Sequence, residues 1–81
     1  MEKEFIIFAA RFFHVPPVKI KKKTKIKDLQ REVHDPVVFS FEVEKHYGIE
    51  IGEDEYEGIK TIEDYMMIVE THLEQGYKKA A

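Results

Sequence analysis

Near the start of the chain, an apolar stripe at helical spacing ends at two consecutive prolines. Apolar side chains recur at positions i, i+3, i+4 and i+7, the spacing of one face of an α-helix: Phe5, Phe8, Ala9 and Phe12. Ile6 and Phe13 widen this stripe. Proline pushes the residue before it out of the helical region, so the Val-Pro-Pro run at residues 15–17 must end the helix. We therefore expect a first helix over residues 3–14, followed by an extended exit.

The length and composition of the chain restrict it to one small domain. Because 81 residues bury only a modest core, every apolar helix face must be used in packing, and we expect a single domain over residues 1–81. Without cysteine, the chain has no disulfide, no thiolate metal ligand and no thiol nucleophile. The longest apolar run, residues 5–10, is too short to cross a bilayer, and no secretion signal is recognisable. The sequence therefore predicts a cytoplasmic location.

Asp35 and Pro36 form a strong start signal for a second helix. Aspartate can accept hydrogen bonds from the free amides of a first turn, and proline is pre-set for the first helical position. In a helix from here to about residue 47, the side chains of Phe39, Val43 and Tyr47 would lie on one face. The apolar residues at 39, 41 and 43 also alternate with polar ones, as in a half-buried strand, and periodicity alone does not decide between the two.

The rest of the chain contains signals for a short helix and a final long helix. Gly48 is a natural end for the second helix, and residues 53–57 suit a short helix before the next glycine. The connection between these two is expected to be anchored by Ile49 and Ile51. Thr61 followed by Asp64 is similar to a capping box, in which each side chain bonds the backbone amide of the other residue. We expect the last helix to end at Gly76, with an inner face of Ile62, Tyr65, Met66, Val69 and Leu73.

Two stretches of this pattern together resemble the second half of an acyl carrier protein. They are DLQREVHDPVVF, residues 28–39, and GIEIGEDEYEGIKTIEDYMMIV, residues 48–69. Residues 28–30 take the place of the family's Asp-Leu-Gly, and residues 32–34 fall where the family has Asp-Ser-Leu. The resemblance implies an all-α fold, a four-helix bundle of three long helices and one short one, and it favours a helix over a strand for residues 35–47. The expected core is Phe5, Phe8, Phe12, Phe39, Val43, Tyr47, Ile51, Ile59, Ile62, Met66 and Val69.

Valine at position 33 removes the feature that makes these proteins carriers. The family attaches phosphopantetheine to the serine, whereas Val33 has no hydroxyl, so we expect no cofactor. Pro36 should also move the helix start about one turn later, which leaves Val33 in the preceding loop. Ser40 is the only serine of the chain, and we expect it to be structural, because a hydroxyl in the middle of a helix usually bonds the carbonyl four residues back.

The resemblance without the serine predicts that this chain is not an enzyme. It predicts a carrier-like interaction domain that binds an enzyme of acyl or metabolite assembly. The residues assigned to partner binding on this basis are Val37, Val38 and Phe41, which match positions that face partner enzymes, with a polar rim of Glu44, Glu50, Glu53 and Asp54. An alternative is that the long connection covers the three apolar side chains. A genuine carrier loaded by a non-standard route is an alternative function. The sequence favours a protein partner over nucleic acid, and a monomer over an oligomer.

The connection between the first two helices is rich in lysine. We expect residues 18–27 to form a long loop held in place by Val18, Ile20 and Ile26. Its basic side chains could bind phosphates of nucleic acid or of an acidic lipid: Lys19, Lys21, Lys22, Lys23, Lys25 and Lys27. Because the run has no aromatic residue for base stacking and no arginine, the sequence favours a solvated loop over a binding site. Residues 1–27 have eight Lys/Arg against two acids, and residues 28–81 have five against fourteen, so the loop also offsets an acidic half.

The histidines and carboxylates show no spacing typical of catalysis or of metal binding. The histidines are dispersed and form no HxxxH or HExxH pair: His14, His34, His46 and His72. His34 is the strongest candidate for a functional histidine, because it follows the position of the missing serine. The carboxylates after Gly52 lack the apolar surroundings that raise a carboxyl pKa for acid–base catalysis: Glu53, Asp54, Glu55 and Glu57. We therefore predict no catalytic residue and no metal site.

Overall fold

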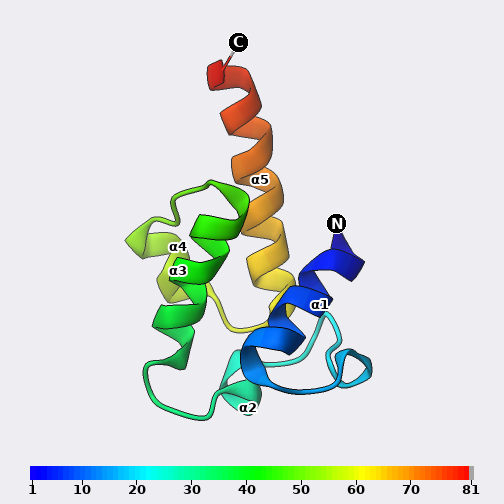
Figure 1. Cartoon of the computed structure of the whole chain (residues 1–81). Helices are drawn as coiled ribbons and strands as arrows, with labels where there is room; N and C mark the ends of the chain where they lie inside the picture. The colour runs from blue at the N-terminus through cyan, green and yellow to red at the C-terminus, as the bar shows by residue number, and fades with distance from the viewer. Residues whose placement is uncertain (81) are drawn as a thin grey trace.

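The chain folds into a bundle of helices, seen in a computed structural model that describes the backbone of residues 1–80 and the side chains of residues 1–75. The elements are α1 (Glu2–Phe13), the 3-10 turn η1 (Pro17–Lys19), α2 (Ile26–Leu29), α3 (Asp35–Tyr47), α4 (Glu53–Gly58) and α5 (Ile62–Ala80). The long helices α1, α3 and α5 pack together, and the short α4 lies on the side of α3 away from α1 (Figure 1). The prediction of an all-α fold is confirmed, and residues 35–47 form a helix rather than a strand.

Two features of the helices differ from the prediction. The lysine-rich connection contains the short elements η1 and α2, which the sequence analysis expected to be plain loop. The last helix does not end at Gly76, because α5 continues to Ala80. The upper part of α5 therefore extends beyond the other helices (Figure 1).

The hydrophobic core lies where α1, α3 and α5 meet. Its buried side chains are Phe5, Ala9, Ala10, Phe13, Ile20, Ile26, Phe39, Val43, Ile62, Tyr65, Met66 and Val69. Phe39 is at the centre of this cluster: its ring centroid lies 4.9 Å from that of Phe13 and 5.0 Å from that of Tyr65. Edge-to-face and tilted pairs at such distances add to the free energy gained by burial. Other side chains of the predicted core pack against this cluster but stay partly exposed: Phe8, Phe12, Tyr47, Ile51 and Ile59.

The buried face of α1 is rotated relative to the predicted stripe. Phe13 and Ala10 are fully buried, whereas Phe8 and Phe12 are only half-buried. The reason is that apolar residues cover more than half of this helix, so several rotations satisfy the helical spacing equally well. Packing against the other helices selects one rotation of α1. In this rotation Ala9 and Ala10 are in the core, and Phe12 and Phe13 pack against Phe39.

The lysine-rich connection is fixed to the start of α5 through backbone hydrogen bonds. The amides of Ile62 and Glu63 donate to the carbonyls of Thr24, at 3.0 Å, and Lys22, at 2.9 Å. The amide of Ile26 donates in return to the carbonyl of Lys60, at 2.9 Å. The connection thus satisfies amides that would otherwise be free at a helix start.

Three apolar residues were predicted to anchor this connection, and one of them does not. Ile20 and Ile26 are buried, as expected. Val18, the middle residue of the η1 turn, is 74% exposed.

The start of α3 uses Asp35 differently from the prediction. Asp35 is the first residue of the helix, and its carboxylate accepts hydrogen bonds from the preceding amides of Arg31, at 2.7 Å, and Glu32, at 3.0 Å. It therefore caps the turn before α3, not the free amides of α3 itself. These two amides hold the pKa of Asp35 below its ordinary value. Val33 lies in this turn and is 79% exposed, so the prediction that it precedes the helix is confirmed.

The remaining helix ends follow the sequence signals closely. Gly48 ends α3 in the left-handed conformation, with φ of 66°. At the start of α5, the amide of Asp64 donates to Thr61 Oγ1 at 3.2 Å, and the amide of Thr61 donates to Asp64 Oδ2 at 3.0 Å, which confirms the capping box. Leu73 is the exception on the inner face of α5, because it is 41% exposed.

Candidate docking groove between α3 and α4

A groove of about 390 Å³ runs between α3 and α4. Its lining residues are Val37, Ser40, Phe41, Glu44, Ile51, Glu53 and Tyr56. Four of the residues assigned to partner binding from sequence meet here: Val37, Phe41, Glu44 and Glu53. The other three do not line the groove: Val38, Glu50 and Asp54. Sequence reasoning missed Ile51 and Tyr56 as lining residues, because it treated the first as a loop anchor and did not consider the second.

The apolar side chains at the mouth of the groove are open to solvent. Phe41 is 59% exposed, and its neighbours Val37 and Val38 are 41% and 43% exposed. The alternative prediction, that the long connection covers these side chains, is therefore wrong. The connection is instead bonded to the start of α5, and it leaves Val37, Val38 and Phe41 exposed on α3.

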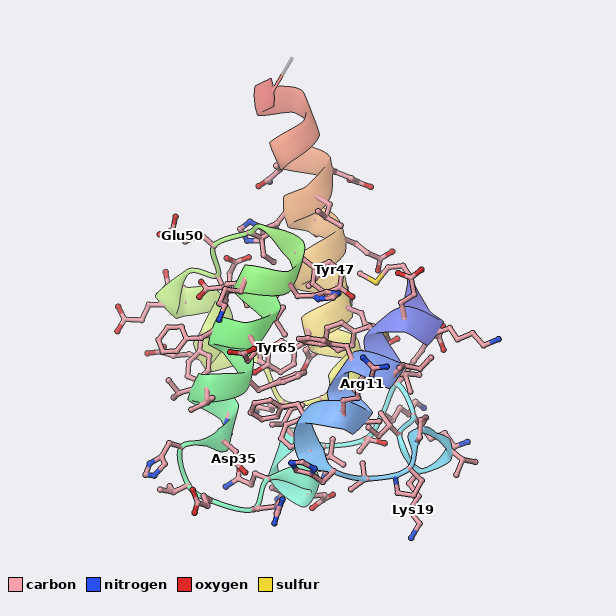
Figure 2. The ribbon with its side chains drawn as sticks, in the orientation of Figure 1. Arg11, Lys19, Asp35, Tyr47, Glu50 and Tyr65 are labelled. Carbon is pink, nitrogen blue, oxygen red and sulfur yellow. The ribbon has the colours of Figure 1, made fainter. Side chains whose placement is uncertain are left out.

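A buried hydrogen-bond network holds Ser40, one of the residues that line the groove. The Ser40 hydroxyl lies 2.8 Å from the hydroxyl oxygen of Tyr65, which donates to the carbonyl of Pro36 at 3.3 Å. Since Tyr65 uses its proton on Pro36, the Ser40 hydroxyl donates to Tyr65. Figure 2 shows Tyr65 between α3 and α5. Burial raises the pKa of Tyr65 to about 12, and the hydrogen bond from Ser40 opposes this rise.

This network gives Ser40 the structural role that the sequence predicted, through a different partner. Ser40 is 6% exposed, so an attachment enzyme has little access to its hydroxyl. The carbonyl four residues before it, that of Pro36, accepts from Tyr65 instead of from Ser40. Val33, at the position where the resemblance places the attachment serine, has no hydroxyl.

The groove is acidic: Glu44 and Glu53 line it, and its lining holds no basic residue. Residues 42–57 contain seven carboxylates against one lysine, a net charge of −6. Glu44 combines two roles, because it lines the groove and its Oε2 accepts a hydrogen bond from the amide of Ile51 at 2.8 Å. Glu53 is exposed in the first turn of α4. Glu50 projects from the outer edge of the molecule (Figure 2).

A polar clamp that the sequence did not reveal attaches α4 to α5. His72 Nε2 lies 2.9 Å and 3.0 Å from the two carboxylate oxygens of Glu55, and Glu55 Oε1 also accepts from the amide of Gly52 at 2.9 Å. The Gly52 amide and the neighbouring His72 hold the pKa of Glu55 below its ordinary value of 4.5. No sequence pattern links Glu55 to a histidine 17 residues away.

The other predicted candidates lie apart from the groove. His46 stacks on Phe8 with ring centroids 4.5 Å apart, and His14 caps the end of α1. His34 is exposed before α3. Among the residues whose side chains are described, no group of three His, Asp or Glu is placed to hold a metal ion. The six lysines of the connection are all exposed: Lys19, Lys21, Lys22, Lys23, Lys25 and Lys27. Lys22 also forms an ion pair with Glu2 at 3.4 Å.

The sequence matches no protein-family model and no curated protein. Within the described part of the chain, no helix is both long enough and apolar enough to cross a membrane.

Proposed function

We propose that this chain is a non-catalytic protein-interaction domain that binds a basic segment of a partner protein in the groove between α3 and α4. The observation that carries the proposal is Phe41, an aromatic side chain 59% exposed at the mouth of a groove lined by apolar and acidic side chains. A bound segment would place an apolar anchor between Phe41 and Tyr56 and its positive charges near Glu53.

The apolar part of the groove supports binding through burial. Covering an exposed aromatic side chain gains roughly 25 cal/mol for each Å² of apolar surface removed from water. Aromatic residues in partly preformed pockets are frequent energetic centres of protein interfaces. The groove is partly preformed, because the hydrogen bond to Tyr65 fixes Ser40 in its lining, so a smaller ordering cost falls on this side of the complex.

The charge of the groove selects the sign of the partner. Glu44 and Glu53 in the groove, within a stretch of net charge −6 at residues 42–57, attract a segment rich in lysine or arginine and repel an acidic one. Lys45, the one lysine in this stretch, is already 3.8 Å from Glu42. Attraction of this kind mainly raises the association rate and weakens as salt is added.

The partner class follows from the resemblance to acyl carrier proteins, which the order of the helices supports. A long helix, a long connection, a second long helix, a short helix and a final long helix occur in the expected order. A carrier-like domain without an attachment residue would compete with a true carrier for an enzyme of acyl or metabolite assembly, or replace it structurally.

A direct test uses two labelled peptides with the same pattern of leucines, one flanked by lysine and arginine and the other by glutamate. Amide NMR shifts of the protein locate each peptide, and a titration gives its Kd. We expect the basic peptide to shift residues of α3 and α4, and the acidic peptide to leave them unchanged. Phe41→Glu should weaken binding of the basic peptide by at least about tenfold. Val18→Glu is the matched control, since it places the same charge on another exposed apolar side chain.

Equal binding of both peptides, or equal loss with Phe41→Glu and Val18→Glu, would rule out the groove as the docking site. If the peptides behave as expected, affinity capture with the same three proteins identifies the natural partner. That partner should be retained by the native chain and by Val18→Glu and lost with Phe41→Glu.

The rival function, a genuine carrier, has its own test. We expect the native chain to gain no phosphopantetheine mass when it is incubated with coenzyme A and a broad transferase. Val33→Ser should also remain poorly modified, because residue 33 lies in a turn before α3 rather than at the helix start, and Asp35 occupies the amides of that turn. Intact mass spectrometry measures both results, with an ordinary carrier protein as the positive control. Efficient modification of either protein would favour the carrier.

A further inference from the structure

We infer that the lysine-rich connection between α1 and α3 binds the surface of an anionic lipid membrane. This surface is separate from the docking groove and carries the opposite charge. Residues 14–34 have seven Lys/Arg against two acids, a net charge of +5. In Figure 2, Lys19 projects from the lower edge of the molecule, while Glu50 lies at the opposite, upper side.

The lysines are held on a rigid frame. Ile20 and Ile26 are buried, and the backbone between them is bonded to the start of α5 through Thr24 and Lys22. Within the connection, the amide of Lys21 donates to Thr24 Oγ1 at 2.8 Å. Docking on a membrane therefore needs little additional ordering of the backbone.

Most of this positive charge is not neutralised within the protein. Lys22 forms an ion pair with Glu2, and the other five lysines have no such pair among the described side chains. Three lysines also line a hollow of about 560 Å³ that has no carboxylate in its lining: Lys25, Lys27 and Lys60. Ile26 and Ile59 also line it. A hollow lined by both lysines and apolar residues suits a phosphate-bearing lipid headgroup.

An exposed apolar tip lies directly beside the lysines. Val18 is 74% exposed, and Pro16 and Pro17 next to it are exposed as well. An apolar tip among lysines gives the two signals that reversible membrane attachment requires, insertion into the interface and attraction to anionic lipid. Nucleic acid fits these observations less well, because it would use aromatic or arginine side chains and gain nothing from a valine.

The experiment is co-sedimentation of the full chain with vesicles of phosphatidylcholine, with and without about one third phosphatidylserine, near physiological salt. We expect binding only to the vesicles that contain phosphatidylserine, with progressive loss as salt is raised. Lys25→Gln should lower the ratio of bound to free protein about fivefold. Lys45→Gln, which removes a lysine from α3 outside the connection, should change it less than about twofold.

A second pair of variants separates a membrane from a polyanion. Val18→Ser should lower vesicle binding about fivefold, whereas Met67→Ser, at an exposed apolar position on α5, should not change it. A single-stranded RNA oligomer serves as the competing ligand. The proposal is overturned if the chain binds the oligomer but not the phosphatidylserine vesicles, or if Val18→Ser and Met67→Ser give the same result. Circular dichroism of each variant verifies that the fold is kept.

Discussion

Phe39 and Phe41 lie two residues apart on α3 and have opposite surroundings. Phe39 is fully buried, and its ring lies within 5.1 Å of three other aromatic rings, measured between centroids. Phe41 is 59% exposed and lines the groove beside α4. The inner face of α3 is thus committed to the fold, whereas the outer face leaves apolar surface free for another molecule.

The two faces are also stabilised by different interactions. The inner face packs against α1 and α5 through large apolar side chains. The outer face meets α4, which has no fully buried residue and is held by polar bonds of Glu55. Polar bonds near the surface contribute less free energy than the burial of aromatic rings. The difference means that the outer side can change without loss of the bundle, which suits a binding surface.

The largest expected effect comes from the centre of the inner face. Phe39→Ala should lower the free energy of unfolding by about 3–5 kcal/mol, because it leaves a cavity where several aromatic rings now meet. In a domain of this size such a loss approaches the total stability, so the variant should be largely unfolded at room temperature. Urea unfolding followed by circular dichroism measures it. A loss below about 1 kcal/mol would mean that the core can repack around the gap.

The inner face could be predicted from sequence because its signals are local. Helical spacing identified Phe39, Val43 and Val69 as core residues, and all three are buried. Gly48 and the Thr61 capping box form hydrogen bonds or turns with residues only a few positions away, so the helix ends they set do not depend on the rest of the fold. The phase of α1 was less certain for the opposite reason: its apolar residues cover too much of the helix to fix one rotation.

The polar contacts of the outer side could not be predicted in the same way. The bond between Ser40 and Tyr65 spans 25 residues, and the pair of Glu55 and His72 spans 17. Both depend on how the helices pack, which no local pattern specifies. The same holds for Val18, whose exposure follows from a short turn that proline-rich loops can form in several ways.

A smaller effect is expected where the inner and outer faces meet, at Tyr65. Tyr65→Phe removes the acceptor of the Ser40 hydroxyl and the donor to the Pro36 carbonyl, so we expect a loss of about 1–2 kcal/mol in the free energy of unfolding. Ser40→Ala in the Tyr65→Phe background should add little further loss, because their shared bond is already absent. Urea unfolding of the single and double variants gives the coupling. Fully additive losses would show that the bond contributes nothing.

Tyr65 also predicts an alkaline pH dependence. Its pKa is about 12 in the folded protein against an ordinary 10.0, so the unfolded chain releases the proton first as pH rises. Stability is therefore fully present below pH 10 and falls between pH 10 and 12. Tyr65→Phe should make this fall shallower, while Tyr47, whose pKa is raised by burial, retains part of it. Unfolding measured at several alkaline pH values tests the prediction, which an unchanged slope would contradict.

On the outer side, Glu55→Gln should cost only about 0.5–1 kcal/mol, since the pair with His72 is partly open to solvent and is screened. The pKa of Glu55 is below its ordinary 4.5 in the folded protein, so its stabilisation is present above pH 4.5 and is lost as pH falls through the lowered value. Glu55→Gln should reduce this acid loss, and Asp35, whose pKa is also lowered, should retain the rest. Amide hydrogen exchange, compared between Glu55→Gln and the native chain, should be accelerated more in α4 than in α1. Uniformly faster exchange would place Glu55 in the common folding unit instead.

The smallest effect on stability should occur at Phe41, and it tests the comparison most directly. Phe41→Gln should change the free energy of unfolding by no more than about 0.5 kcal/mol, because most of this side chain is already in water. Phe41→Glu should be slightly less stable than Phe41→Gln, since it adds a charge to a stretch that already has a net charge of −6. Thermal unfolding at low and high salt separates the two contributions, because salt screens only the charge. If Phe41→Gln lost as much stability as a core substitution, Phe41 would be required for the fold. Weaker peptide binding by variants at this position would then say nothing about docking. If the variant stays as stable as the native chain, any weakening of peptide binding by substitution at this position reports the groove itself.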